Sequence, residues 1–166
     1  KSTTWYQSGE IKSEVNYKND KIEGKMIWWF ESGEKQREAD YKDGKLDGIL
    51  TDWNENGQIE SKKNYTDNNL VKYSYFENGQ KKYEVNYKDD KLNGKYTQWY
   101  ESGQILQVEN YKDDKIVGKS TTWYQSGEKK IEVNYKDGMM EGNSTTWYQS
   151  GEKKIEANYK NDKIEG

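Results

Sequence analysis

Paired carboxylates are the side chains of this sequence that most directly suggest chemistry. Adjacent acids such as Asp89-Asp90 and Asp113-Asp114 are the residue types of a glycosidase pair or of a calcium site. Both pairs, however, recur at the same point of a repeated pattern, where Asp and Asn favour a tight turn. A calcium loop also needs more oxygen ligands at fixed spacing, whereas lysines intervene here. We therefore interpret the pairs as turn residues and expect no metal site.

The composition excludes most catalytic systems. The 166 residues include no His and no Cys, which rules out Ser-His-Asp and Cys-His nucleophiles, thiol redox centres and Cys/His zinc sites. Each remaining acid or base recurs as a repeat position, so none marks a unique site. We expect no catalytic residue, no cofactor and no enzymatic activity.

The charge pattern narrows the classes of partner. There are 27 basic and 30 acidic residues, interleaved along the chain with a net charge of -3, which argues against nucleic-acid binding. No polybasic cluster supports binding to anionic lipid, so a membrane lipid is the weakest of the alternatives. Neither a membrane span nor a signal peptide is visible. The sequence does not decide between a bacterial cell surface, secretion and the cytoplasm.

The chain is an internal repeat with a period of 24 residues. Its seven repeats are 1–24, 25–48, 49–72, 73–94, 95–118, 119–142 and 143–166, and the fourth is two residues short. Because no divergent cap is visible, we interpret 1–166 as one continuous array taken from a longer chain. A glycine and a tyrosine mark each repeat as structural positions: Gly9, Gly33, Gly57, Gly79, Gly103, Gly127 and Gly151, and Tyr17, Tyr41, Tyr65, Tyr87, Tyr111, Tyr135 and Tyr159.

Each repeat predicts two β-strands. Turn signals of the Ser8-Gly9 kind and of the Asn19-Asp20 kind alternate along the chain. The segments between them are rich in Trp, Tyr, Thr, Ile and Val, which mix with Lys and Glu at a period of two, and Pro is absent. The predicted fold is all-β: an elongated, single-sheet antiparallel β-meander of seven β-hairpin repeats, with about fourteen strands.

The first turn decides which face of the sheet is apolar. A two-residue turn at Ser8-Gly9 would place Trp5 on the Lys/Glu-rich face, opposite Val15 and Tyr17. A three-residue turn with a glycine bulge would shift the register by one and place Trp5 beside Ile11, Val15 and Tyr17. Ser precedes the glycine in five of the seven repeats and suits a right-handed turn position, so we favour the bulged turn. An aromatic residue in all repeats at the position of Trp5 also favours burial.

Repeats three and four break the pattern. Lys72 stands where most repeats have glycine, Asn54 replaces an aromatic residue, and the two missing residues are assigned to the first strand of repeat four. Removing two residues preserves side-chain alternation, so the sheet can continue. We predict a kink or weak point within residues 66–76.

These motifs resemble the MORN variant repeats of bacterial YwqK-like proteins. The resemblance is carried by Y-K-D-G-K-L-D-G at 41–48 followed by W-N-E-N-G at 53–57, and it extends over the whole chain. It implies an elongated antiparallel repeat sheet without catalytic machinery. Members of that family are often labelled antitoxins of polymorphic toxin systems, and related eukaryotic MORN repeats are associated with membranes and scaffolding. Fold transfers through such a resemblance more safely than function does.

The tryptophans are the candidate binding residues. A row of flat rings suits a protein groove or a sugar, but in a chain with only 23 Ile, Leu, Val and Phe residues most of the rings are expected to form the core. The end rings and Trp28 are the expected exceptions. We predict a noncatalytic scaffold that binds another protein, with a carbohydrate-binding surface domain as the alternative, and self-association through terminal edge strands as an added option. The candidates are Trp5, Trp28, Trp29, Trp53, Trp99, Trp123 and Trp147.

Overall fold

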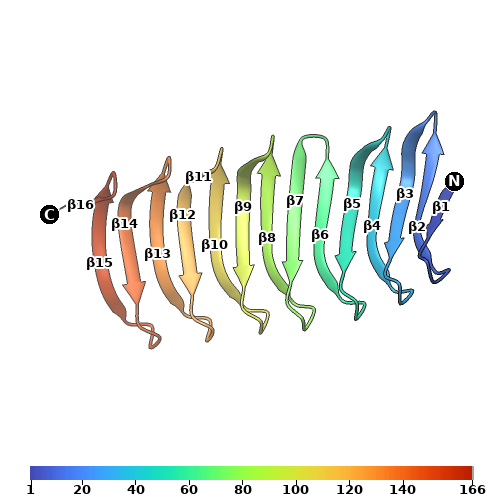
Figure 1. Cartoon of the computed structure of the whole chain (residues 1–166). Coiled ribbons are helices and arrows are strands. Elements are labelled where there is room, and N and C mark those ends of the chain that lie inside the picture. The colour runs from blue at the N-terminus through green and yellow to red at the C-terminus, as the bar shows by residue number, and fades with distance from the viewer. Residues whose placement is uncertain (166) are drawn as a thin grey trace. The chain divides into compact units, whose positions relative to one another are not determined.

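The computed structural model describes residues 1–165, and this range contains 16 β-strands and no helix (Figure 1). No part of that range therefore forms a helix able to cross a membrane. The strands are β1 (Ser2–Trp5), β2 (Ile11–Lys18), β3 (Lys21–Trp29), β4 (Lys35–Lys42), β5 (Lys45–Trp53), β6 (Ile59–Thr66), β7 (Asn69–Tyr75), β8 (Lys81–Lys88), β9 (Lys91–Trp99), β10 (Ile105–Lys112), β11 (Lys115–Ile116), β12 (Gly118–Trp123), β13 (Lys129–Lys136), β14 (Met139–Trp147), β15 (Lys153–Lys160) and β16 (Lys163–Ile164).

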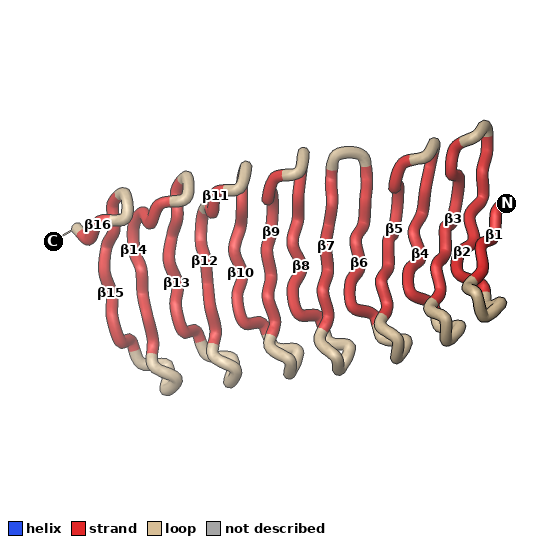
Figure 2. The backbone as a smooth tube through the Cα atoms, in the orientation of Figure 1, coloured by secondary structure: helices blue, strands red, loops and turns tan. Residues whose placement is uncertain are grey.

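The chain forms two compact bodies, which we call the N-terminal body (Lys1–Gly79) and the C-terminal body (Gln80–Gly166). Within each body, consecutive strands pair antiparallel in sequence order, and β11 and β12 are two pieces that both pair with β10 (Figure 2). The predicted all-β antiparallel hairpin meander is confirmed. The strand number exceeds the predicted fourteen because Val117 interrupts one strand and because β16 begins a further one.

The first turn of each repeat has three residues. In the first repeat the Gly9 amide donates to the Tyr6 carbonyl at 3.1 Å, and the Tyr6 amide donates to the Glu10 carbonyl at 2.8 Å. Gly9 has a φ of 94°, a conformation that a side chain would strain. These are the features of a type I turn closed by a glycine bulge. The predicted three-residue turn is confirmed.

The predicted position of Trp5 is nevertheless wrong, because its hairpin contains a second bulge. Trp5 pairs with Ile11, but the next rung joins Thr4 to Ser13, which leaves Lys12 as an extra residue. Thr4, Ser13 and Val15 therefore share one face, and Trp5 lies on the other. Two bulges in succession restore the side-chain alternation that a two-residue turn would have produced.

The second turn has two residues. Asn19 and Asp20 both have positive φ, at 50° and 58°, and connect the paired residues Lys18 and Lys21, as in a type I′ turn. Turns of successive repeats also bind each other: the Asp114 amide donates to the Leu92 carbonyl at 3.0 Å. The Asp114 carboxylate in turn accepts from the Leu92 amide at 2.8 Å. The Asp114 carboxylate thus accepts a main-chain hydrogen bond that joins two repeats.

The repeated tyrosine and glycine meet across strands. Tyr41 lies opposite Gly24, whose φ of 78° marks a bulge in β3. The positive φ explains the glycine, because a side chain would be strained in that conformation. The same pairing joins Gly48 to Tyr65, Gly94 to Tyr111, Gly118 to Tyr135 and Gly142 to Tyr159.

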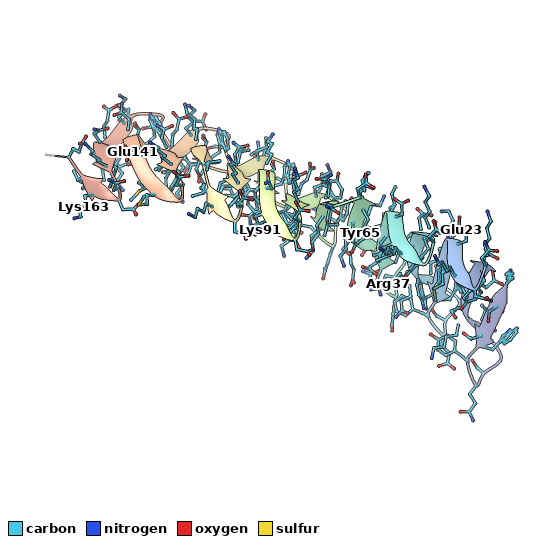
Figure 3. All side chains as sticks on the ribbon, turned by 90° about the horizontal axis from the view of Figure 1, so that it is seen from above. Glu23, Arg37, Tyr65, Lys91, Glu141 and Lys163 are labelled. Carbon is cyan, nitrogen blue, oxygen red and sulfur yellow. The ribbon has the colours of Figure 1, made fainter. Side chains whose placement is uncertain are left out.

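The core is thin and lies on the face opposite the tryptophans of the repeated row. We call the face that carries Val15, Ala39 and Leu50 in the N-terminal body, and Val85 and Val133 in the C-terminal body, the valine face; these residues are 0 to 9% exposed. The other face, which carries Lys25, Glu38, Lys119 and Glu132, is the lysine–glutamate face. Figure 3 shows side chains on both faces of the ribbon with no further layer of ribbon over them.

The irregular hairpin β6–β7 shows where two residues were lost. In β2–β3, Val15 pairs with Met26 and Tyr17 pairs with Ile22, so β3 has two more residues between these pairs than β2 has. The bulged glycine is among the residues between them. Hairpin β6–β7 pairs without interruption from Ser61–Ser74 to Thr66–Asn69. The deletion therefore removed the bulge together with its glycine, and Lys72 occupies the rung that Met26 and Leu50 occupy in other hairpins.

Candidate functional site

The repeated tryptophan row lies on the lysine–glutamate face, where lysines cover the rings. The Lys35 ammonium lies 2.7 Å from Glu38 and 5.8 Å from the centre of the Trp53 ring, so one cation serves an ion pair and a cation–π contact. The same arrangement joins Lys81 to Glu84 and Trp99, and Lys129 to Glu132 and Trp147. Trp5, at the N-terminal end, is 60% exposed, whereas Trp28, Trp29, Trp53, Trp99, Trp123 and Trp147 are half-buried.

The ion pairs on this face stabilise the charged forms of Lys25, Glu38 and Glu132. Hydrogen bonds from Lys25 and Lys35 lower the pKa of Glu38 below its ordinary value, and the Glu38 partner raises the pKa of Lys25. Hydrogen bonds from Lys129 and Lys119 lower the pKa of Glu132 in the same way. The lysines of these pairs are therefore neutralised locally, and these parts of the face carry little net charge.

An aromatic residue after the repeated tryptophan connects neighbouring hairpins. The Tyr6 hydroxyl donates to the Trp29 carbonyl at 2.7 Å, and its ring carries the Lys12 ammonium at 5.4 Å. Tyr100 and Tyr124 make the same bond to Trp123 and Trp147, each at 2.8 Å. Phe30, Asn54 and Phe76 occupy this position in repeats two to four and have no phenolic hydroxyl to donate, and Tyr148 occupies it in repeat seven.

A groove is present where Asn54 replaces the aromatic residue. The Asn54 side chain packs against the turn that follows it. Its oxygen accepts hydrogen bonds from the Asn56 amide at 3.0 Å and from the Gln58 amide at 2.9 Å. A short side chain in this position fills less space than a ring. On one side of Asn54 an open groove encloses about 730 Å³, and a second hollow of about 260 Å³ lies on its other side, towards Phe76.

Residues at two variable positions of the repeat line the larger groove. Trp28 stands opposite Arg37, Arg37 opposite Asp52, and Asp52 opposite Ser61, so four successive strands bring them together on the valine face. Arg37 is the single arginine of the sequence, and its Nε donates to the Asp52 carboxylate. Ser61 donates to the other oxygen of Asp52 at 2.9 Å.

The Trp28–Arg37–Asp52–Ser61 groove offers an indole wall and a charged, hydrogen-bonded floor. Arg37 keeps 47% of its side chain exposed although it is paired, whereas Asp52 keeps 17%. A guanidinium fixed by one carboxylate still has donors for a ligand. An indole and a guanidinium with spare donors are groups that can recognise a ligand.

The comparison with family models agrees with this description of the repeats. The model described as MORN repeat variant matches seven times, at residues 1–19, 22–43, 46–67, 69–89, 92–113, 116–137 and 140–161. The chain belongs to the MORN repeat variant family. The matches identify the repeat class and not the YwqK-like subfamily. No curated protein matches the chain.

MORN repeats are generally noncatalytic modules that often bind proteins or lipids. The structure agrees on the roles of the family's repeated residues in this chain. The glycines of the first turn, from Gly9 to Gly151, all have positive φ. The repeated tyrosines lie on the valine face, where Tyr41, Tyr65, Tyr111, Tyr135 and Tyr159 pair with bulged glycines.

The structure separates the predicted binding residues into two sets. Trp28 lies on the valine face in the groove, whereas its neighbour Trp29 belongs to the repeated row on the other face. Sequence reasoning noted Trp28 and Asn54 but missed Arg37, Asp52 and Ser61. The available signal was the single arginine, which stands where other repeats have Ser, Tyr, Gln or Ile.

Proposed function

We propose that this MORN repeat chain is a noncatalytic scaffold that binds a protein partner through the Trp28–Arg37–Asp52–Ser61 groove. The observation that carries the proposal is convergence: residues at variable positions of two successive repeats line one hollow. Residues that keep the pattern make the turns, the tyrosine–glycine pairs and the hydrogen bonds between hairpins. Groove residues that make none of these structural contacts are best explained by a ligand that they bind.

The chemistry of the groove suits a protein. Trp and Arg are enriched among the residues that dominate protein interfaces, because they combine apolar area with directional hydrogen bonds. Sugar rings need flat, open aromatic platforms, and three of the repeated indoles carry a lysine ammonium over their rings instead. Lipid headgroups need free cations, whereas several lysines of the lysine–glutamate face are bound to glutamates. A protein is therefore the favoured ligand, and a glycan is the alternative that the test must distinguish.

Two biological settings fit a protein-binding scaffold of this family. In toxin immunity the groove would hold a toxin encoded beside this chain, and at a cell surface it would hold a protein of a host or a neighbouring cell. The support for toxin immunity is the sequence resemblance alone. Co-expression with a neighbouring toxin gene tests it: rescue of growth that depends on the groove supports immunity, and growth arrest unaffected by this chain contradicts it.

The groove can be tested by filling it. Asn54→Tyr restores the aromatic residue of other repeats, so we expect an intact fold. In a pulldown, this variant should lose the protein partner that the wild-type chain retains. Arg37→Gln should weaken retention as well, because it removes the charged floor. Tyr124→Asn is the matched control, since it makes the reverse exchange in the C-terminal body and should leave retention intact.

The outcomes separate the alternatives. Equal retention of the partner by wild type and Asn54→Tyr would contradict a groove-bound protein. A glycan array read with the same proteins supplies the second arm: glycan binding that Asn54→Tyr abolishes would replace the protein partner by a carbohydrate. Circular dichroism and urea unfolding of each variant show whether a loss of binding reflects a loss of fold.

A further inference from the structure

Repeat five exchanges a core residue for a carboxylate. Its sequence Gln107-Val108-Glu109 stands where the neighbouring repeats have Tyr83-Glu84-Val85 and Ile131-Glu132-Val133. The strand register is unchanged, because Glu109 pairs with Tyr96, and Tyr96 pairs with Val85 on the next strand. Glu109 therefore lies on the valine face, in the row of buried valines.

Neutral groups hold the Glu109 carboxylate without cancelling its charge. Tyr111 donates to its Oε2 at 2.6 Å, while Gln107 and Ser120 donate to its Oε1 at 2.5 and 3.2 Å. No lysine or arginine of residues 1–165 forms an ion pair with it. A carboxylate fixed by three neutral donors keeps its orientation and its full negative charge, which attracts a cation.

Aromatic rings border this carboxylate. The Tyr96 and Tyr111 rings are edge to face, with centres 6.4 Å apart and planes at 86°. Burial, and then the hydrogen bond to Glu109, raise the pKa of Tyr111, and burial and the same carboxylate raise the pKa of Tyr96. Both phenols therefore stay neutral at physiological pH. Neutral aromatic rings near a carboxylate favour an organic cation, because the cation is attracted both by the carboxylate and by the rings.

The opposite face shows the complementary change. Val108 occupies the place of Glu38 and Glu132, which bind Lys25 and Lys119. The equivalent lysine of repeat five, Lys95, has no acidic partner among the described residues. Val108 and Glu109 have thus exchanged residue types relative to the neighbouring repeats, and the sheet has lost an ion pair and a buried valine. A structural role does not explain this loss.

We propose that Glu109, Tyr96 and Tyr111 form a site for the cationic side chain, arginine or lysine, of a bound protein segment. That a protein supplies the cation rests on the function proposed above; the site itself rests on the contacts of Glu109. The site lies in the C-terminal body and is separate from the Trp28–Arg37–Asp52–Ser61 groove of the N-terminal body. Arginine is the better fit, because a guanidinium can share the carboxylate and stack on a ring.

The experiment titrates the whole chain, labelled for NMR, with three peptides: acetyl-Gly-Arg-Gly-amide, its lysine counterpart and its neutral citrulline counterpart. We expect the cationic peptides to shift the Gln107 side-chain amide and the Ser120 amide, and citrulline to leave both unmoved. Glu109→Val, which restores the residue of the row, should weaken arginine-peptide binding by about tenfold or more. Glu109→Gln, which keeps an acceptor but not the charge, should do the same.

Glu132→Gln on the lysine–glutamate face is the matched control and should bind as wild type does. Equal shifts with arginine and citrulline, or unchanged affinity in Glu109→Val, would overturn the proposal. Shifts spread over the acidic residues of the whole chain would also overturn it, because they indicate nonspecific attraction. Since Asn54→Tyr tests a different body of the chain, either proposal can fail while the other stands.

Discussion

The Tyr6 hydroxyl donates a hydrogen bond of 2.7 Å to the main-chain carbonyl of Trp29, which lies one repeat further along the chain. The bond adds a side-chain link to hairpins that the backbone ladder already joins. It explains why the residue after the repeated tryptophan is so often tyrosine. The same link recurs at Tyr100 and Tyr124, so its strength can be measured in the C-terminal body, away from the groove.

Removing one such hydroxyl should destabilise the chain modestly. Tyr124→Phe deletes the 2.8 Å bond to the Trp147 carbonyl and keeps the ring, so we expect a loss of about 0.5–1.5 kcal/mol in the free energy of unfolding, measured with urea. Tyr148→Phe is the control, because the Tyr148 hydroxyl makes no hydrogen bond within residues 1–165. Equal losses in the two variants would contradict the role of the bond.

The second turn should tolerate glycine better than alanine. Asp114 has a φ of 66°, which an alanine enters at a cost of about 1–2 kcal/mol, and alanine also loses the 2.8 Å bond from the Leu92 amide. Asp114→Gly loses that bond as well but relieves the strain, and Gly44 and Gly138 occupy the same position in other repeats. Thermal unfolding should rank wild type and Asp114→Gly above Asp114→Ala. An alanine variant as stable as the glycine variant would be inconsistent with this account.

Hairpin β6–β7 remains the predicted weak point. Lys63 lies directly opposite Lys72 in the row that elsewhere holds buried apolar side chains, and like charges in that geometry are destabilising. We expect amide hydrogens of residues 66–76 to exchange faster than those of repeats six and seven, measured by hydrogen exchange and mass spectrometry. Lys63→Val should slow that exchange. Exchange that is no faster in residues 66–76 would refute the prediction.

Tyr111 should titrate at unusually high pH. Burial and its hydrogen bond to Glu109 raise its pKa in the folded chain, so the folded state releases this proton later than the unfolded state does. The corresponding stability is complete below about pH 10, where an unfolded tyrosine titrates, and is lost as the pH rises through the folded pKa. Urea unfolding at alkaline pH should show a smaller pH-dependent loss for Tyr111→Phe. Glu109→Gln should lower the pKa of Tyr111, read from tyrosinate absorbance; an unchanged titration would contradict the contribution of Glu109.

Much of the fold follows from local sequence signals. The recurrence of Ser-Gly or Asn-Gly every 24 residues predicts the three-residue turns, because a glycine is needed where φ is positive. The constant Tyr and the glycine that follows the second turn recur in register, and Tyr41 pairs with Gly24 across strands. The turns depend on residues a few positions apart, so one repeat is enough to specify them, whereas the Tyr41–Gly24 pair joins two repeats.

Which face of the sheet each side chain occupies depends on how the strands pair, and only the tertiary structure determines that pairing. Nothing in the Lys12 side chain indicates that this residue is bulged. Yet the bulge places Trp5 and Val15 on opposite faces of the sheet, because every bulge shifts the side-chain alternation by one residue. The groove and the Glu109 site have the same origin. Trp28, Arg37, Asp52 and Ser61 come from four strands, and only the summed register of those strands places them in one row.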